Sequence, residues 1–143
     1  MDASDLYKDV LLAHYRSPRN YGDLEHVDVV QRGSNPRCGD EVEVGVRFDG
    51  ERLAKVVFRG RCCAICMASA SMMTEVLTGH QRDEAKRLCR DMTAWFSGAD
   101  ERTVAAPPEP LPALSAVRPY PARSRCVLLA WEALDAALAV TTG

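Results

Sequence analysis

The chain has 143 residues, and its 18 lysines and arginines against 20 aspartates and glutamates give a formal net charge of −2. Its content of 47% hydrophobic and 27% charged residues is ordinary for a globular protein and excludes a disordered chain. The balanced charge argues against a general nucleic-acid binder, because neutralising phosphates needs an excess of positive charge. The N-terminus carries no secretory signal and no apolar run is long enough to span a bilayer, so we expect a cytoplasmic protein without a membrane partner.

The N-terminal part of the chain predicts a helix followed by an edge strand. Apolar residues recur at a spacing of three to four residues after Ser4, which can cap a helix. Pro18 disfavours helix in the residue before it and is followed by a turn at 19–22. Residues 27–31 fit an edge strand, and residues 33–40 are rich in turn formers.

The clearest strand pattern lies at residues 42–48, where valines and a phenylalanine alternate with charged residues and a glycine. Asp49 and Gly50 follow, and this dipeptide is a strong signal for a two-residue hairpin turn. Residues 53–58 supply the returning strand. The sequence therefore predicts an antiparallel sheet at this point.

Helical patterns dominate the second half of the chain. Residues 64–77 and 82–96 predict two helices, and residues 123–140 predict a final one. Between them, residues 97–121 contain six prolines and predict a linker or a long surface loop. Strands that precede helices indicate an α+β fold, with a small antiparallel sheet of about three strands packed against several helices. We expect one domain over residues 1–143, with a Pro-rich insertion at about 97–121.

Cysteine usage is the most informative feature of the composition. Six cysteines in a chain without an export signal are expected to be metal ligands, reactive thiols or core residues rather than disulfides. They stand at positions 38, 62, 63, 66, 89 and 126. Cys38 lies in a turn-forming segment, Cys63 lies between a strand and a helix, and Cys126 stands where the last helix is expected to open. The dipole at a helix N-terminus stabilises a thiolate, which is the form that binds metals and acts as a nucleophile.

Asp40, two residues after Cys38, can bring a carboxylate to the same point. Three thiolates and one carboxylate would fill a tetrahedral zinc shell. The spacing matches no compact zinc-finger pattern, so burial of these cysteines in the core stays an equal alternative. Cys89, in the middle of a predicted helix, is expected to be such a core residue.

Two further patterns are weaker. Cys63 and Cys66 form a C-x-x-C pair, but a thioredoxin-like redox site expects a βαβ unit, whereas here a hairpin precedes the pair. The three histidines lie apart in sequence, so each is expected to be a surface or structural residue; they are His14, His26 and His80.

Four segments together resemble the U-type iron–sulfur cluster assembly family. Residues 14–20 read HYRSPRN, 35–40 read NPRCGD, 64–74 read AICMASASMMT and 125–131 read RCVLLAW. The resemblance covers about residues 4–140 and implies a SufE/IscU-like α+β fold. It also implies four metal ligands, which fall on Cys38, Asp40, Cys63 and Cys126. The metal would be zinc or, alternatively, a [2Fe–2S] cluster on the same ligands.

Within that family the chain resembles the zinc-dependent, SufU-like branch more than the scaffold, IscU-like branch. The scaffold branch has a histidine just before its third cysteine, and here that position is Arg125. The zinc-dependent branch has a basic residue there and an extra segment before the last helix, which residues 97–113 resemble. The chain departs from the family at Cys62, where glycine is common, and at Cys66, where serine is common.

The resemblance implies a sulfur carrier of the sulfurtransferase type. Its thiolate would take the outer sulfur of a persulfide on a SufS-like cysteine desulfurase and pass it to a downstream scaffold or apo-protein. We place the accepting thiol on Cys38, because a loop residue can leave a metal at less structural cost than a helix residue. Two alternatives stay open: a scaffold that assembles a [2Fe–2S] cluster, and a binding module whose zinc only holds the fold.

Overall fold

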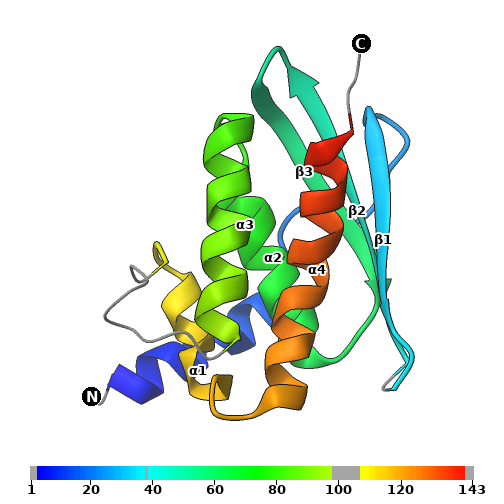
Figure 1. Ribbon diagram of the computed structural model, residues 1–143. Helices are drawn as coiled ribbons and strands as arrows, with labels where there is room; N and C mark the ends of the chain where they lie inside the picture. Colours follow the sequence, from blue (N-terminus) through cyan, green and yellow to red (C-terminus); the bar gives the residue numbers. More distant parts are fainter. Residues whose placement is uncertain (1–2, 38, 98–106, 141–143) are drawn as a thin grey trace.

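An antiparallel sheet and a layer of helices on one of its faces make up the fold (Figure 1). The computed structural model describes residues 3–37, 39–97 and 107–140. The elements, in chain order, are α1 (Ala3–Arg16), β1 (Val29–Asn35), β2 (Asp40–Asp49), β3 (Arg52–Arg61), α2 (Ala64–Leu77), α3 (Arg82–Phe96), the 3-10 helix η1 (Leu111–Val117) and α4 (Pro121–Ala139). The three strands lie in the order β1-β2-β3, which confirms the predicted α+β class.

The predicted alternation in β2 is confirmed and determines which face of the sheet is buried. Val42, Val44 and Val46 are completely buried, while the charged residues that alternate with them, Glu41, Glu43 and Arg47, lie nearer to solvent. Val44 stands opposite Phe58 of β3, which is also completely buried. Gly50 in the turn has a φ of 61°, a backbone conformation that favours glycine, so the hairpin closes where the sequence predicts it.

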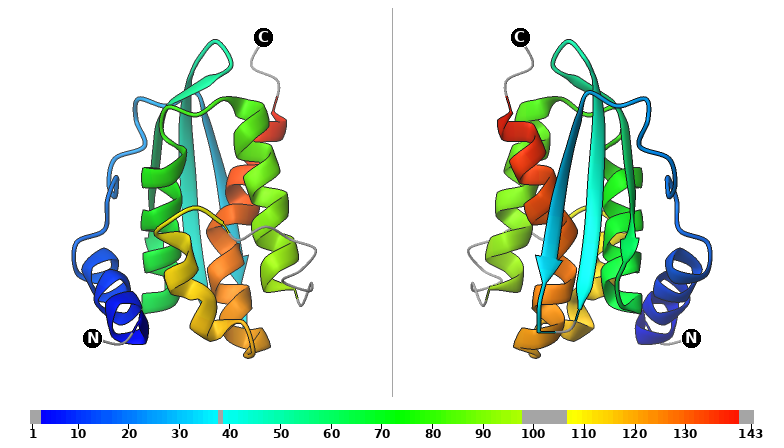
Figure 2. Two further views of the ribbon diagram at one scale, coloured as in Figure 1. Left: turned by 90° about the vertical axis from the view of Figure 1, so that its left-hand side faces the viewer. Right: turned by 90° about the vertical axis from the view of Figure 1, so that its right-hand side faces the viewer.

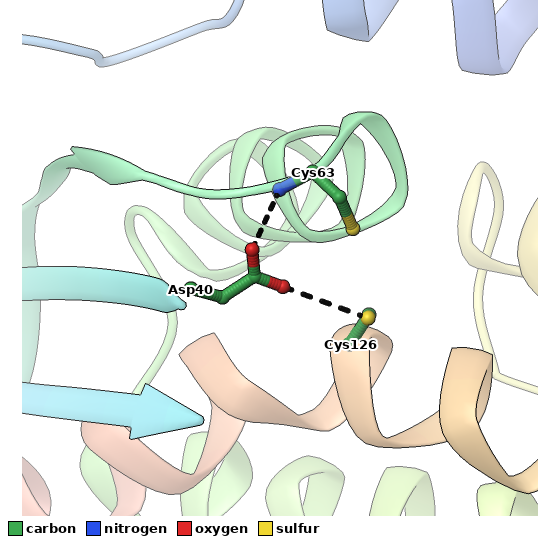
Figure 3. Close-up of side chains that lie close together, drawn as sticks. All are labelled: Asp40, Cys63 and Cys126. Carbon is green, nitrogen blue, oxygen red and sulfur yellow. Dashed lines mark hydrogen bonds between the residues drawn. The ribbon is translucent and has the colours of Figure 1, made fainter. Parts of the chain in front are cut away.

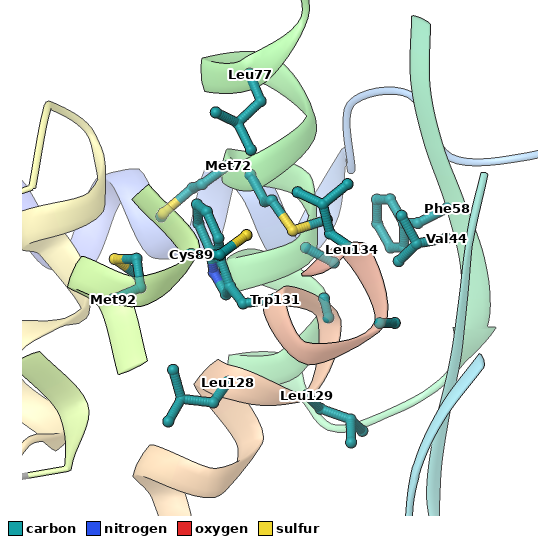
Figure 4. Close-up of a cluster of buried hydrophobic side chains, with 14 of the residues drawn as sticks. Val44, Phe58, Met72, Leu77, Cys89, Met92, Leu128, Leu129, Trp131 and Leu134 are labelled. Atoms are coloured by element: carbon teal, nitrogen blue, oxygen red, sulfur yellow. The ribbon is translucent and has the colours of Figure 1, made fainter. Parts of the chain in front are cut away.

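Helices α2 and α4 cover the buried face of the sheet, and α3 packs against α4 from outside (Figures 1 and 2). Helix α4 lies over β1 and β2, while α2 lies against β3. The core between these layers is apolar and includes Met72, Trp131 and Leu134 (Figure 4). The indole Nε1 of Trp131 donates to Ser69 Oγ at 3.1 Å, which satisfies a buried polar group between α2 and α4.

Helix α1 is joined to α2 by a buried hydrogen bond. His14 Nδ1 lies 2.7 Å from Ser71 Oγ, and the backbone N–H of Arg19 donates to the same hydroxyl at 2.8 Å. Residues 20–22 then follow the free edge of β3, where Phe58 donates its N–H to Asn20 O at 3.0 Å. His14 is therefore a satisfied structural residue, as predicted.

Three boundaries differ from the sequence prediction. Strand β1 begins two residues later than expected and continues to Asn35, because its pairing with β2 extends into the predicted loop. The predicted loop at 97–121 contains η1, whose Leu111 and Leu114 are completely buried, and its residues 98–106 lie outside the described residues. Helix α4 begins at Pro121, because proline suits the first position of a helix.

Among the described residues, no helix combines the length and the apolar character needed to cross a bilayer.

Candidate metal centre

Three ligand-type side chains from three different elements meet at one end of the sheet (Figure 3). Asp40 is the first residue of β2, Cys63 is the residue that caps α2, and Cys126 lies on α4. One carboxylate oxygen and the two sulfur atoms all lie within 4.8 Å of one another. Residues far apart in the sequence thus form one compact group.

Hydrogen bonds orient the carboxylate of Asp40 between the two cysteines. Its Oδ1 accepts a hydrogen bond from the backbone N–H of Cys63 at 3.1 Å. Its Oδ2 lies 3.6 Å from Cys126 Sγ, and these two atoms form a hydrogen bond when the thiol is protonated. Cys63 Sγ in turn accepts from the N–H of Cys66 at 3.5 Å, in the position of a helix cap. The predicted place of Cys63 at a helix start is confirmed.

Cys126 does not stand at the start of a helix, as the sequence analysis expected. Because α4 begins at Pro121, Cys126 lies in the second turn of the helix, where the N–H groups are already bonded within the helix. The helix dipole therefore gives the Cys126 thiolate little of the stabilisation expected for a terminal residue. Its contact with Asp40 is the feature that places it in the group.

The distance between the Cys126 sulfur and the Asp40 carboxylate fits a tetrahedral zinc ion. Zinc lies about 2.3 Å from a thiolate sulfur and about 2.0 Å from a carboxylate oxygen, so a tetrahedral angle separates the two ligand atoms by about 3.5 Å. The observed separation between Cys126 Sγ and Asp40 Oδ2 is 3.6 Å. Two thiols and a carboxylate are also a donor set that suits zinc.

The group is sheltered but reachable from one side. Asp40 and Cys126 each expose 6% of their surface, whereas Cys63 is half-buried and Gly39 is exposed. Cys38, the fourth predicted ligand and the predicted sulfur acceptor, lies outside the described residues. Its place in the shell stays a prediction.

A groove of about 890 Å³ lies beside the group and was not foreseen from the sequence. We call it the basic groove, and its lining residues are Asn35, Pro36, Arg37, Pro121, Ala122, Arg123, Arg125 and Cys126. Arg37, Arg123 and Arg125 are exposed and surround the mouth of the groove with positive charge. Arginines that flank two cysteine motifs are the signal from which the groove could have been predicted.

The three other cysteines divide into two kinds. Cys89 is buried in α3 as predicted, and burial together with the charge of Asp135 raises its pKa to about 12. Cys62 and Cys66 lie close to Cys63 of the candidate metal centre along the chain, and Cys66 is completely buried. A hydrogen bond with the Cys62 side chain, followed by burial, raises the pKa of the Cys66 thiol.

The fold and this group of side chains define a small α+β domain that gathers thiols and a carboxylate at the end of a three-stranded sheet. The sequence model of the NifU-like N-terminal domain matches residues 6–141. The chain belongs to this family.

Relatives of known name agree with the family assignment. The chain is 35% identical over 138 residues to the zinc-dependent sulfurtransferase SufU of Bacillus subtilis, covering 96% of this chain and 92% of that protein. It is 34% identical over 133 residues to the iron–sulfur cluster assembly scaffold protein IscU of Streptococcus pyogenes, covering 93% of this chain and 82% of that protein.

A solved structure agrees as well. The chain is similar to the crystal structure of an iron–sulfur cluster assembly scaffold protein for the SUF system from Fervidobacterium islandicum, with a TM-score of 0.80 and 29% identity. The superposed part covers 96% of this chain and 99% of that one. The resemblance noted from the sequence motifs is thereby confirmed over nearly the whole chain.

Proposed function

We propose that this chain acts in iron–sulfur cluster assembly as a zinc-dependent sulfur acceptor, working as a single domain over residues 1–143. The observation that carries the proposal is the meeting of Asp40, Cys63 and Cys126 within 4.8 Å at one end of the sheet. The similarity to a zinc-dependent sulfurtransferase over 96% of the chain supports the same function.

The proposed zinc ligands are Asp40, Cys63 and Cys126, with Cys38 as the fourth. When bound, zinc would keep the thiols deprotonated without adding redox chemistry of its own. The three described ligands are held by β2, α2 and α4, which are fixed to one another by the core. Such a frame keeps the site in place while one ligand exchanges.

The proposed reaction is a sulfur transfer between thiols. A cysteine desulfurase carries a persulfide, and the Cys38 thiolate attacks its outer sulfur. The desulfurase cysteine leaves as a thiolate, and Cys38 becomes the persulfide, so atoms and electrons balance without an oxidant or a reductant. The arginines of the basic groove favour the approach of an anionic persulfide.

Arg125 supports sulfur transfer over the alternative of a cluster scaffold. The scaffold branch has a histidine at this position, and a histidine can bind iron, whereas a guanidinium cannot bind a metal ion. Here Arg125 is exposed and pairs with Glu132 at 3.0 Å. The similarity to a scaffold protein of Streptococcus pyogenes keeps cluster assembly on the same ligands as the second candidate.

The test is mass spectrometry of the zinc-loaded protein after incubation with a cysteine desulfurase and L-cysteine. We expect the first persulfide on Cys38, and we expect Cys38→Ser to abolish stimulation of the desulfurase. Cys89→Ser is the matched control, because Cys89 is buried in α3 outside the site. A first persulfide on Cys62, Cys66 or Cys126, with Cys38 unmodified, would overturn the choice of thiol.

A further inference from the structure

The two edges of the sheet differ in how they are covered. At β3 the chain covers its own edge, because the N–H of Phe58 donates to Asn20 O and the N–H of Gly22 donates to Phe58 O, both at 3.0 Å. At the opposite margin, β1 is paired with β2 on one side only (Figure 1). Within the described ranges, no segment outside the sheet forms a backbone hydrogen bond with residues 30–34. The described part of the sheet therefore has its open edge at β1.

The hydrogen bonds of β3 determine which backbone groups of β1 are free. Phe58 turns its N–H and C=O toward residues 20–22, so Val44, which stands opposite Phe58 in β2, turns its own toward β1. Gln31 stands opposite Val44 and is therefore bonded to β2. Because these groups alternate in direction along a strand, those of every second residue point away from the sheet. These residues are Val30, Arg32 and Ser34.

Strand β1 lacks the features that usually protect an edge from pairing. It contains no proline, and it pairs with β2 in an unbroken register over its seven residues. Its one charged side chain, Arg32, pairs with Glu41 of β2. Val30 is 42% exposed although it is apolar. A regular row of free donors and acceptors of this kind pairs with an extended segment of another chain.

The open edge leads into the basic groove. Asn35 ends β1 and lines the groove, whose volume is about 890 Å³. Arg37 and Arg123 line it as well, and neither has a carboxylate partner among the described residues. The first turn of α4, which forms another wall, has no acidic residue, and Tyr120 gives it no side-chain cap. The positive end of the helix dipole thus adds to the charge of the arginines, and the groove attracts negative charge.

We propose that the open edge of β1 and the basic groove form one docking surface for an extended acidic segment of a partner protein. The segment pairs with Val30, Arg32 and Ser34 as a fourth strand, and its carboxylates enter the groove beside Cys126. Main-chain hydrogen bonds then supply affinity, and the charge of the groove selects acidic segments.

A second copy of the chain fits this surface less well. An antiparallel pair of two whole β1 strands centres on Arg32 and places this residue of both copies opposite one another. Like charges directly opposite across two strands are destabilising. The proposal concerns binding alone, so its failure would leave the proposed sulfur transfer intact.

The experiment follows backbone hydrogen exchange of the isotope-labelled, zinc-loaded protein by NMR. The probe is a synthetic peptide with seven residues of alternating threonine and valine, the length of β1, and with glutamates at both ends. In the free protein we expect fast exchange at Val30, Arg32 and Ser34 and slow exchange at Gln31 and Gly33. The peptide should slow exchange at the first three and leave the other two nearly unchanged. A purely electrostatic contact would not give this alternation.

Two changes test the two halves of the surface. Val30→Pro removes one outward N–H and leaves the bonds of Gln31 to β2 in place, so the peptide should bind about fivefold more weakly. Val30→Thr is the matched control and should bind as the wild type does. Arg123→Glu, which leaves the strand untouched, should weaken binding about tenfold at low salt, as should replacing the glutamates of the peptide with lysines.

Absence of binding would overturn the proposal, as would equal binding of the acidic and the basic peptide. Binding that slows no exchange at Val30, Arg32 and Ser34 would also overturn it, because the strand edge would then play no part. Sedimentation is the companion measurement. A dimer whose amides at these three positions are protected without any peptide would assign the edge to a second copy instead.

Discussion

The sulfur of Cys126 lies 3.6 Å from a carboxylate oxygen of Asp40, although 86 residues separate the two along the chain. One residue begins β2 and the other lies on α4, and α4 packs directly over β1 and β2. The candidate metal centre is thus built by the docking of a helix on a sheet. Any change that shifts this helix is expected to disturb the site.

Removing the Asp40 carboxylate should affect both the metal and the fold. Asp40→Ala deletes a proposed ligand and leaves the partly buried N–H of Cys63 without the acceptor at 3.1 Å. We expect faster zinc loss to a chelator, and a free energy of unfolding of the metal-free protein lower by about 1–3 kcal/mol. Asp40→Asn is the matched control, because its amide oxygen still accepts from Cys63. It should lose zinc quickly yet keep near-wild-type stability; if both variants unfold alike, the hydrogen bond is not the cause.

Gly33 tests the docking of α4 on the sheet. A Cβ at this position would lie 2.9 Å from the backbone oxygen of Leu129, closer than such atoms pack. Gly33→Ala should therefore push α4 away from β1, lower the free energy of unfolding by about 1–3 kcal/mol and weaken zinc binding at Cys126. Ser34→Ala, at the exposed neighbouring position, is the control for urea titrations and chelator competition. Wild-type zinc affinity in Gly33→Ala would show that the site tolerates movement of α4.

The regular elements could be predicted from local pattern alone. Helices α2 and α3 have the bounds that the sequence predicts. Cys63 and Gln81 cap their starts, and Gly79, with a positive φ, follows the end of α2. Helix η1 was missed, since its Pro-rich composition resembles a linker although Leu111 and Leu114 are buried three residues apart.

The site was only partly readable from the sequence. The ligand types followed from the family motifs, but no spacing rule relates Asp40 to Cys126, because tertiary packing of α4 determines their distance. The thiol pair of Cys62 and Cys66 was visible as two departures from the family pattern.

Charge at the basic groove should control the rate of sulfur transfer. Arg123→Glu places a negative charge where an anionic persulfide approaches, and it leaves the proposed ligands unchanged. We expect desulfurase stimulation to fall about tenfold at low salt, with the difference shrinking as ionic strength rises. Arg90→Glu, exposed on α3, makes the same charge change outside the groove. Equal loss in both variants would mean that net charge, rather than the groove, sets the rate.

Acid should loosen the contact between α1 and α2 through His14. Burial and the charge of Arg19 lower the pKa of His14, so the folded protein holds the neutral ring. Above the ordinary pKa of 6.5, His14 is neutral in both the folded and the unfolded state. As the pH falls below 6.5, the unfolded chain takes up the proton first, so the free energy of unfolding decreases until the pH has passed the lowered pKa of the folded state. His14→Gln keeps a hydrogen-bonding group for Ser71 and should flatten this part of the stability curve of the metal-free protein. His26→Gln, at an exposed position, should follow the wild-type curve; an unchanged curve in His14→Gln would remove His14 as the cause.

The metal content of protein purified without added metal tests the central claim most directly. We expect about one zinc per chain with no iron or acid-labile sulfide, and loss of that zinc in Cys63→Ser and in Cys126→Ser. Cys89→Ser should retain it. Iron with acid-labile sulfide in the wild type, or a full complement of zinc in Cys126→Ser, would contradict a zinc centre on Cys38, Asp40, Cys63 and Cys126.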